Sequence, residues 1–115
     1  MSEALVAAWA RAFLVTQLVE APVYHFGFGA PLSAALAAST LTHPIVWFVF
    51  FGPFEPLASL SYGQRLVLAE VFAWLVEALL LCVWTGRRRA LAWSLLANGS
   101  SVAMSYALRA MFGFP

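Results

Sequence analysis

Three glutamates and one histidine lie inside long apolar stretches of this sequence, where ionisable side chains are unexpected. They are Glu20, His43, Glu70 and Glu77. An ionised side chain that faces lipid at the centre of a helix costs at least about 2.5–3.5 kcal/mol. Two acids in one buried site also couple, so that their protons leave in pairwise steps. These residue types therefore indicate a site that holds a proton, or a cation bound through oxygen with His43 as a nitrogen ligand.

Further polar side chains share helix faces with these residues. In the first apolar stretch, Gln17, Glu20 and Tyr24 recur at steps of three and four, which places them on one face of a helix. The last stretch carries a row of small polar residues that steps by four, three and four: Ser94, Asn98, Ser101 and Ser105. The structural use of such a row is close packing, because small residues let helix backbones approach one another.

The candidate polar cluster is therefore Glu20, His43, Glu70, Glu77 and Asn98. We expect the Glu20 and Glu77 carboxyls to lie in direct or water-bridged contact, because a rise of about 1.5 Å per residue places them at similar depths. Supporting polar positions are Gln17, Tyr24, Thr40, Trp74, Ser94, Ser101 and Ser105.

Three interpretations of this cluster stay open. It can be a satisfied polar core that fixes helix register, it can hold and release a proton or a cation, or it can bind a metal through Glu20, His43 and Glu77. The sequence requires no cofactor. No catalytic residue is predicted, because the chain contains no Asp and therefore no Ser–His–Asp set.

Four apolar stretches must position these side chains. Of the 115 residues, 63% are hydrophobic and 10% are charged, and the mean hydropathy is +0.88. A soluble domain is usually about 45–50% apolar and about 25% charged, so the composition excludes an ordinary soluble enzyme and a disordered segment. A helix that crosses a bilayer needs about 20 mostly apolar residues. Such stretches cover residues 4–26, 32–52, 65–85 and 90–112, and together they predict one transmembrane domain over residues 1–115.

Turn residues separate these stretches. Glycine and proline mark the breaks at residues 27–31 and 52–56, and Gly86 marks the third. Ser61 and Gln64 have the spacing of a capping box for the third helix. Because short connections make neighbouring helices antiparallel, we expect an all-α, up-down bundle of four transmembrane helices with a polar interior.

The second stretch has two features of its own. Pro44 removes a backbone donor and frees the carbonyl of Thr40, which predicts a kink. Ala30, Ala34 and Ala38 offer a small-residue face for close helix packing.

The expected partner is the lipid bilayer of the cell membrane, crossed several times by the chain. Arg87, Arg88 and Arg89 cluster in the third break, and such clusters favour the cytoplasmic side. The net charge of only +1 shows no basic face for nucleic acid. A membrane-protein partner or a second copy of the chain is compatible with this layout.

Three functions follow from these features. The first is a non-catalytic accessory or assembly component of a membrane complex, which the lack of an aqueous domain and of a catalytic set favours. The alternative is a proton- or cation-coupled transporter of small molecules that uses Glu20 and Glu77. A metal-dependent enzyme that modifies lipids is the third, and catalysis is the less favoured class.

Overall fold

The computed structural model describes residues 2–52 and 55–113, and within these ranges the regular structure is entirely helical. Pro53 and Phe54, in the predicted second break, lie outside the described residues. The helical elements are α1 (Glu3–Pro22), η1 (Val23–Phe28), α2 (Leu32–Ile45), η2 (Val46–Phe50), η3 (Glu55–Leu57), α3 (Tyr62–Thr85) and α4 (Ala90–Phe112). The prediction of four long helical segments is confirmed.

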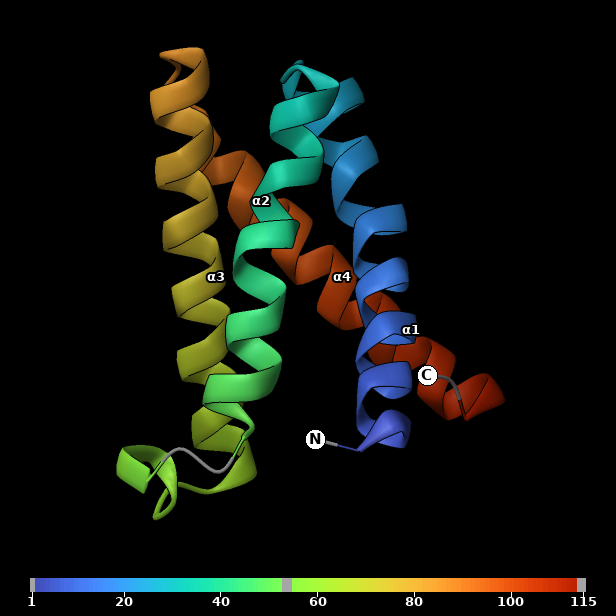
Figure 1. Cartoon of the computed structure of the whole chain (residues 1–115). Helices are drawn as coiled ribbons and strands as arrows, with labels where there is room; N and C mark the ends of the chain where they lie inside the picture. Colours follow the sequence, from blue (N-terminus) through green and yellow to red (C-terminus); the bar gives the residue numbers. More distant parts are fainter. Residues whose placement is uncertain (1, 53–54, 114–115) are drawn as a thin grey trace.

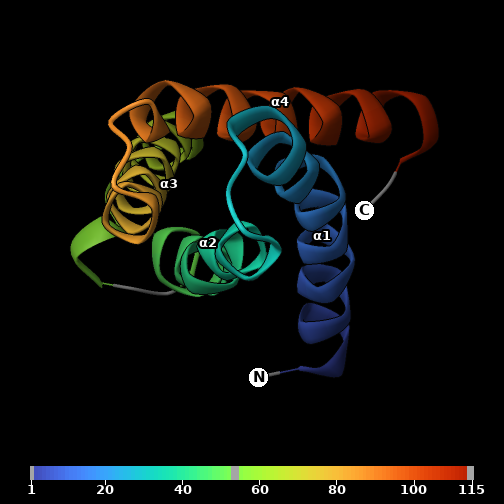
Figure 2. The ribbon, with the colours of Figure 1, turned by 90° about the horizontal axis from the view of Figure 1, so that it is seen from above.

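Three of the helices lie side by side, while the fourth crosses them. In Figure 1, α1, α2 and α3 run roughly along one direction, and α4 passes behind them on a diagonal. The view from above shows α4 along one side of the bundle, next to α3 and α1 and opposite α2 (Figure 2). Consistent with these views, α4 packs against both α3 and α1, and α2 packs between α1 and α3. This diagonal crossing was not predicted.

Local signals fix the helix ends. The Ser2 side chain accepts a hydrogen bond from the Leu5 amide and caps α1. Ser61 and Gln64 form the predicted capping box, which extends α3 to Tyr62, three residues before the predicted start. Gly86 ends α3 with a φ of 72°, a backbone conformation that glycine adopts without steric cost.

Two prolines precede changes of helix type. Pro22 ends α1 and is followed by the π-helical segment η1, and Pro44 lies near the end of α2, just before the π-helical segment η2. A proline removes one backbone donor, and its ring crowds the preceding turn. The backbone beside it relieves this crowding by changing from the hydrogen bonds of an α-helix to the longer-range hydrogen bonds of a π-helix. At Pro44, where a kink is predicted, the structure shows a change from α-helical to π-helical backbone one residue further on.

The distribution of apolar residues is the reverse of that in a soluble protein. Among the described residues, eleven of the fifteen buried apolar residues are alanines, and they include the predicted face Ala30, Ala34 and Ala38. Large apolar side chains lie outside, and Phe26 is 83% exposed. An interior of alanine and polar groups suits close helix packing in lipid, where large side chains gain nothing by turning inward.

Within the described residues, three helical segments are long and apolar enough to cross a membrane: Glu3–Phe28, Leu32–Phe50 and Tyr62–Thr85. The fourth predicted span, α4, is equally long but is not among them. Its serine and asparagine row, together with Arg109, lowers its hydropathy. Three of these polar residues of α4, Ser94, Asn98 and Ser101, are buried in the interior, as shown next.

Candidate functional site

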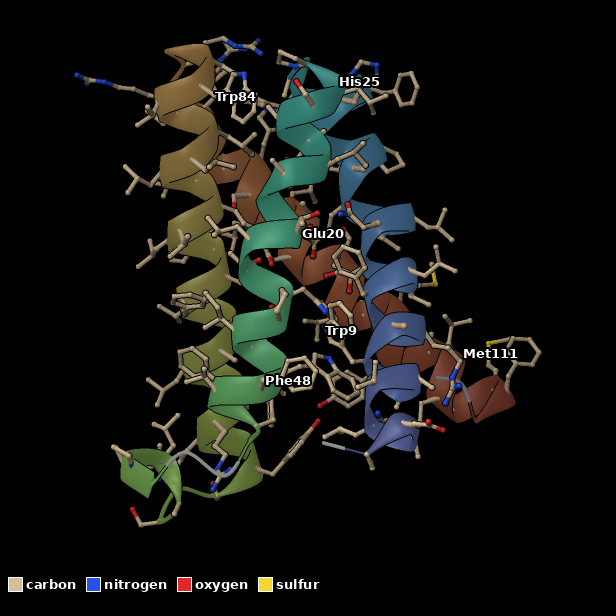
Figure 3. The ribbon with its side chains drawn as sticks, in the orientation of Figure 1. Trp9, Glu20, His25, Phe48, Trp84 and Met111 are labelled. Atoms are coloured by element: carbon tan, nitrogen blue, oxygen red, sulfur yellow. The ribbon has the colours of Figure 1, made fainter. Side chains whose placement is uncertain are left out.

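Two acids meet at the centre of the molecule. Glu20 on α1 and Glu77 on α3 are only 2% and 1% exposed, and both line the buried end of one cavity. Figure 3 shows Glu20 at mid-height, directed from α1 into the space between the helices.

Glu77 accepts hydrogen bonds from three other elements. The Tyr24 hydroxyl donates to Glu77 Oε1 at 2.5 Å, and the Thr42 hydroxyl donates to Glu77 Oε2 at 2.5 Å. The Asn98 amide donates to Glu77 Oε1 at 3.3 Å. Since these donors come from η1, α2 and α4, one carboxyl on α3 connects every long helical segment of the described chain.

Glu20 has a smaller set of donors. The Ser39 hydroxyl on α2 donates to Glu20 Oε1 at 2.6 Å, and the Ser101 hydroxyl on α4 donates to Glu20 Oε2 at 2.5 Å. Both serines are buried. Every oxygen of the Glu20–Glu77 pair therefore accepts at least one hydrogen bond, as burial of a carboxyl requires.

On one side the pair is closed by a continued hydrogen-bond network. The fully buried Tyr24 hydroxyl lies 3.3 Å from Ser94 Oγ, and Ser94 Oγ donates to the Trp74 carbonyl at 2.8 Å. The Trp74 indole in turn donates to the Leu91 carbonyl at 2.8 Å. The network thus runs from the acids to backbone carbonyls of α3 and α4, where it ends.

On the other side the pair borders a cavity of about 300 Å³. Its lining includes Glu20, Glu77, Asn98 and Ser101 at the buried end. At the opposite end the lining includes Tyr62 and Tyr106, which are 58% and 46% exposed. The cavity therefore leads from an exposed mouth to the buried acid pair.

Glu70 lies in the wall of this cavity, apart from the pair. It is two helical turns from Glu77 along α3, it is half-buried, and it accepts no hydrogen bond from the described residues. Arg109 also lines the cavity. The pairing of Glu70 with Arg65 that a solvated helix face would offer is not made, because Arg65 donates to the Gly52 carbonyl at 3.4 Å.

His43 lines the cavity but does not join the acids. Its ring lies among Phe13, Trp9 and Trp47, with centroid distances of 5.5, 6.4 and 6.3 Å. Its Nδ1 atom is buried and has no hydrogen-bond partner in the described part of the chain. Within that part, no three His, Cys, Asp or Glu side chains gather as metal ligands, so the predicted set of Glu20, His43 and Glu77 is not assembled.

The remaining supporting residues lie in three places: in a contact apart from the acids, in the cavity wall, and in the network around the acid pair. Gln17 donates to the Leu36 carbonyl and to Thr40, both at 3.0 Å, and so connects α1 to α2 away from the acids. Ser105 lines the cavity. Tyr24, Ser94 and Ser101 belong to the network around the pair.

Two donors to the acids were not among the predicted site residues. Ser39 and Thr42 lie three residues apart on α2 and share a face with the buried Ala35 and Ala38. That alanine face is the signal that would have identified them, since polar residues within a stripe of small residues face the neighbouring helices. Thr40, which was predicted instead, is exposed.

Comparison of the chain with protein-family models, with curated proteins and with solved structures finds no match, so the geometry of the site carries the functional argument.

Proposed function

We propose that this protein is a small multi-pass membrane protein that carries protons in exchange for a small molecule or cation bound in the cavity. In this proposal the four long segments cross the bilayer in alternating directions, with the polar network in the interior. The observation that carries it is the burial of two neighbouring carboxyls, Glu20 and Glu77, at the inner end of a cavity with an exposed mouth. In this proposal the pair shares one proton, because two carboxylates so close together repel each other.

Coupling follows from the charge of the pair. Two carboxylates in a site of low dielectric repel each other strongly, so loss of the shared proton is favoured when a positive charge enters the cavity. Return of the proton then releases the cation. The exchange needs no covalent step and no cofactor.

Proton flux into reconstituted vesicles tests this proposal. A pH-sensitive dye inside the vesicles reports the flux after a pH gradient is imposed in the presence of an exchanging cation. The cations used are Na⁺, K⁺ and a primary amine, each compared with vesicles that lack the protein. Glu20→Gln and Glu77→Gln should each abolish the flux, because an amide cannot exchange a proton in this range. Glu3→Gln is the matched control, since Glu3 is exposed in the first turn of α1. A parent protein without flux, or variants with unchanged flux, would contradict the proposal.

The second candidate is a non-catalytic subunit of a membrane complex, with a membrane-protein partner or a second copy of the chain. One observation favours it: the hydrogen bonds of the acid pair are complete, as a structural polar core requires. For this candidate Glu77→Gln lowers thermal stability in detergent while the parent shows no proton flux. Purification under native conditions should then recover a complex, and recovery of a free chain alone would count against it.

A further inference from the structure

Glu70 is the acid in the described chain that both borders the cavity and lacks hydrogen-bond donors from the protein. The four oxygens of the Glu20–Glu77 pair already accept hydrogen bonds and are almost inaccessible. A carboxyl group withdrawn from water without donors loses free energy that a ligand can restore. The cavity therefore presents one half-buried carboxyl that is free to accept hydrogen bonds from a ligand.

The charges that line the cavity define the sign of such a ligand. Three acids line the cavity, and they are Glu20, Glu70 and Glu77. Its basic lining residues are Arg109 and His43, and the His43 ring packs among aromatic side chains. Because acids outnumber basic groups in the lining, the cavity favours a cation over an anion.

Aromatic rings define the rest of the ligand. Besides Tyr62 and Tyr106 at the mouth, the lining contains the aromatic side chains of Trp47 and Phe51. Phe51 and Tyr62 pack together with ring centroids 5.4 Å apart. Rings attract a cation through their faces and an apolar body by burial. A volume of about 300 Å³ is at the lower end of small-molecule sites, which span about 300–1,000 Å³.

We propose that the cavity binds a protonated amine with an apolar or aromatic body, and that Glu70 accepts the hydrogen bonds of its ammonium group. The inference rests on the proposed function, because it names the class of small molecule that the same cavity takes. It requires N–H donors on the ligand, so a quaternary ammonium ion of the same shape fits the charge but not the acceptors of Glu70.

Binding of 2-phenylethylamine to the purified full-length protein in detergent tests the inference. Quenching of tryptophan fluorescence reports occupancy, because Trp47 lines the cavity. The primary amine should quench saturably, and its N,N,N-trimethyl analogue should bind at least tenfold more weakly. This comparison uses the unaltered protein, so it does not depend on the folding of any variant. Equal binding of the two probes, or no saturable binding, would overturn the inference.

Variants locate the site. Glu70→Gln should weaken binding of the primary amine at least tenfold and reduce the preference over the trimethyl analogue, whereas Glu3→Gln should change neither. Phe51→Leu should weaken both probes by a few fold, as the loss of one ring contact predicts. Unchanged affinity in Glu70→Gln would overturn the assignment of this residue.

The outcomes separate this inference from the proposed function. Proton flux that depends on Glu20 and Glu77, without saturable amine binding, overturns the amine and leaves proton carriage standing. Amine binding that depends on Glu70, without proton flux, supports the binding site and overturns the transport proposal.

Discussion

Each hydroxyl donor to the acid pair has one hydrogen to give and one carboxyl oxygen to receive it. Ser39 and Ser101 supply Glu20, while Tyr24 and Thr42 supply Glu77. In a buried site, the loss of one donor leaves an acceptor without a partner, which costs more than the net contribution of the hydrogen bond itself. Small polar side chains thus determine whether the acids can be buried at all.

Ser39→Ala should lower the free energy of unfolding by about 1–3 kcal/mol, because Glu20 Oε1 loses its donor at a buried position. Ser33→Ala is the matched control, since Ser33 lies on the same helix and is exposed. Thermal unfolding in detergent, followed by circular dichroism, measures both variants. Equal midpoints for the two variants would show that the Ser39 hydrogen bond contributes nothing to stability.

Helix pairing depends on close approach at a few backbone positions. Gly27 in η1 lies directly against the Trp93 ring of α4, so that a methyl group added at Gly27 would come within 2.5 Å of Trp93 Cζ3. Trp93 in turn packs on the buried cluster that contains Tyr24 and Leu81. Contact between η1 and α4 therefore holds Tyr24, and with it a donor to Glu77, in place.

Gly27→Ala should consequently destabilise the protein by about 1–3 kcal/mol, the usual effect of overpacking a well-packed core. Gly99→Ala in α4 is the control with the opposite sign: a methyl group there meets no atom within 4 Å, and alanine favours a helix by about 0.5–1 kcal/mol over glycine. Unfolding midpoints in one detergent compare the pair. A Gly27→Ala variant as stable as Gly99→Ala would contradict the close packing of Trp93.

Features encoded by local chemistry were predictable from the sequence, whereas those set by the packing between helices were not. The Ser61 capping box depends on four consecutive residues, and it forms as predicted. Whether Thr40 or Thr42 faces the acids depends on how α2 is rotated about its axis, and that rotation is set by the neighbouring helices. In the structure Thr42 donates to Glu77, while Thr40 donates to the Leu36 carbonyl of its own helix. The same rotation places His43 among aromatic rings and away from the acids. Helical spacing identifies a face but not its orientation.

At the scale of the whole molecule, the connections between helices lie at two opposite ends of the bundle. The η3 segment, the start of α1 and the C-terminal end of α4 lie toward one end, and the 86–89 connection lies at the other (Figure 1). The 24 residues of α3 separate the two connections by about 36 Å at about 1.5 Å per residue. That length exceeds the hydrocarbon thickness of about 30 Å. The cavity mouth, with Tyr62 and Tyr106, is on the side of the termini.

Membrane topology can be measured with single cysteines, because Cys82 is the chain's one native cysteine and is replaceable by Ser or Ala. In that background, cysteines placed at Ser2 and at Ser59 should react with a membrane-impermeant maleimide from one side of the membrane. A cysteine at Arg88 should react from the other.

If Arg87–Arg89 lie in the cytoplasm, the Arg88 site reacts in inverted vesicles and is protected in intact cells, so the cavity opens outward. Reaction of the cysteines at positions 59 and 88 from the same side would show that α3 does not cross the bilayer. Recovery of the protein in the soluble fraction, with all introduced cysteines reactive, would show that the chain is not inserted. The apolar exterior would then have to be covered by another protein.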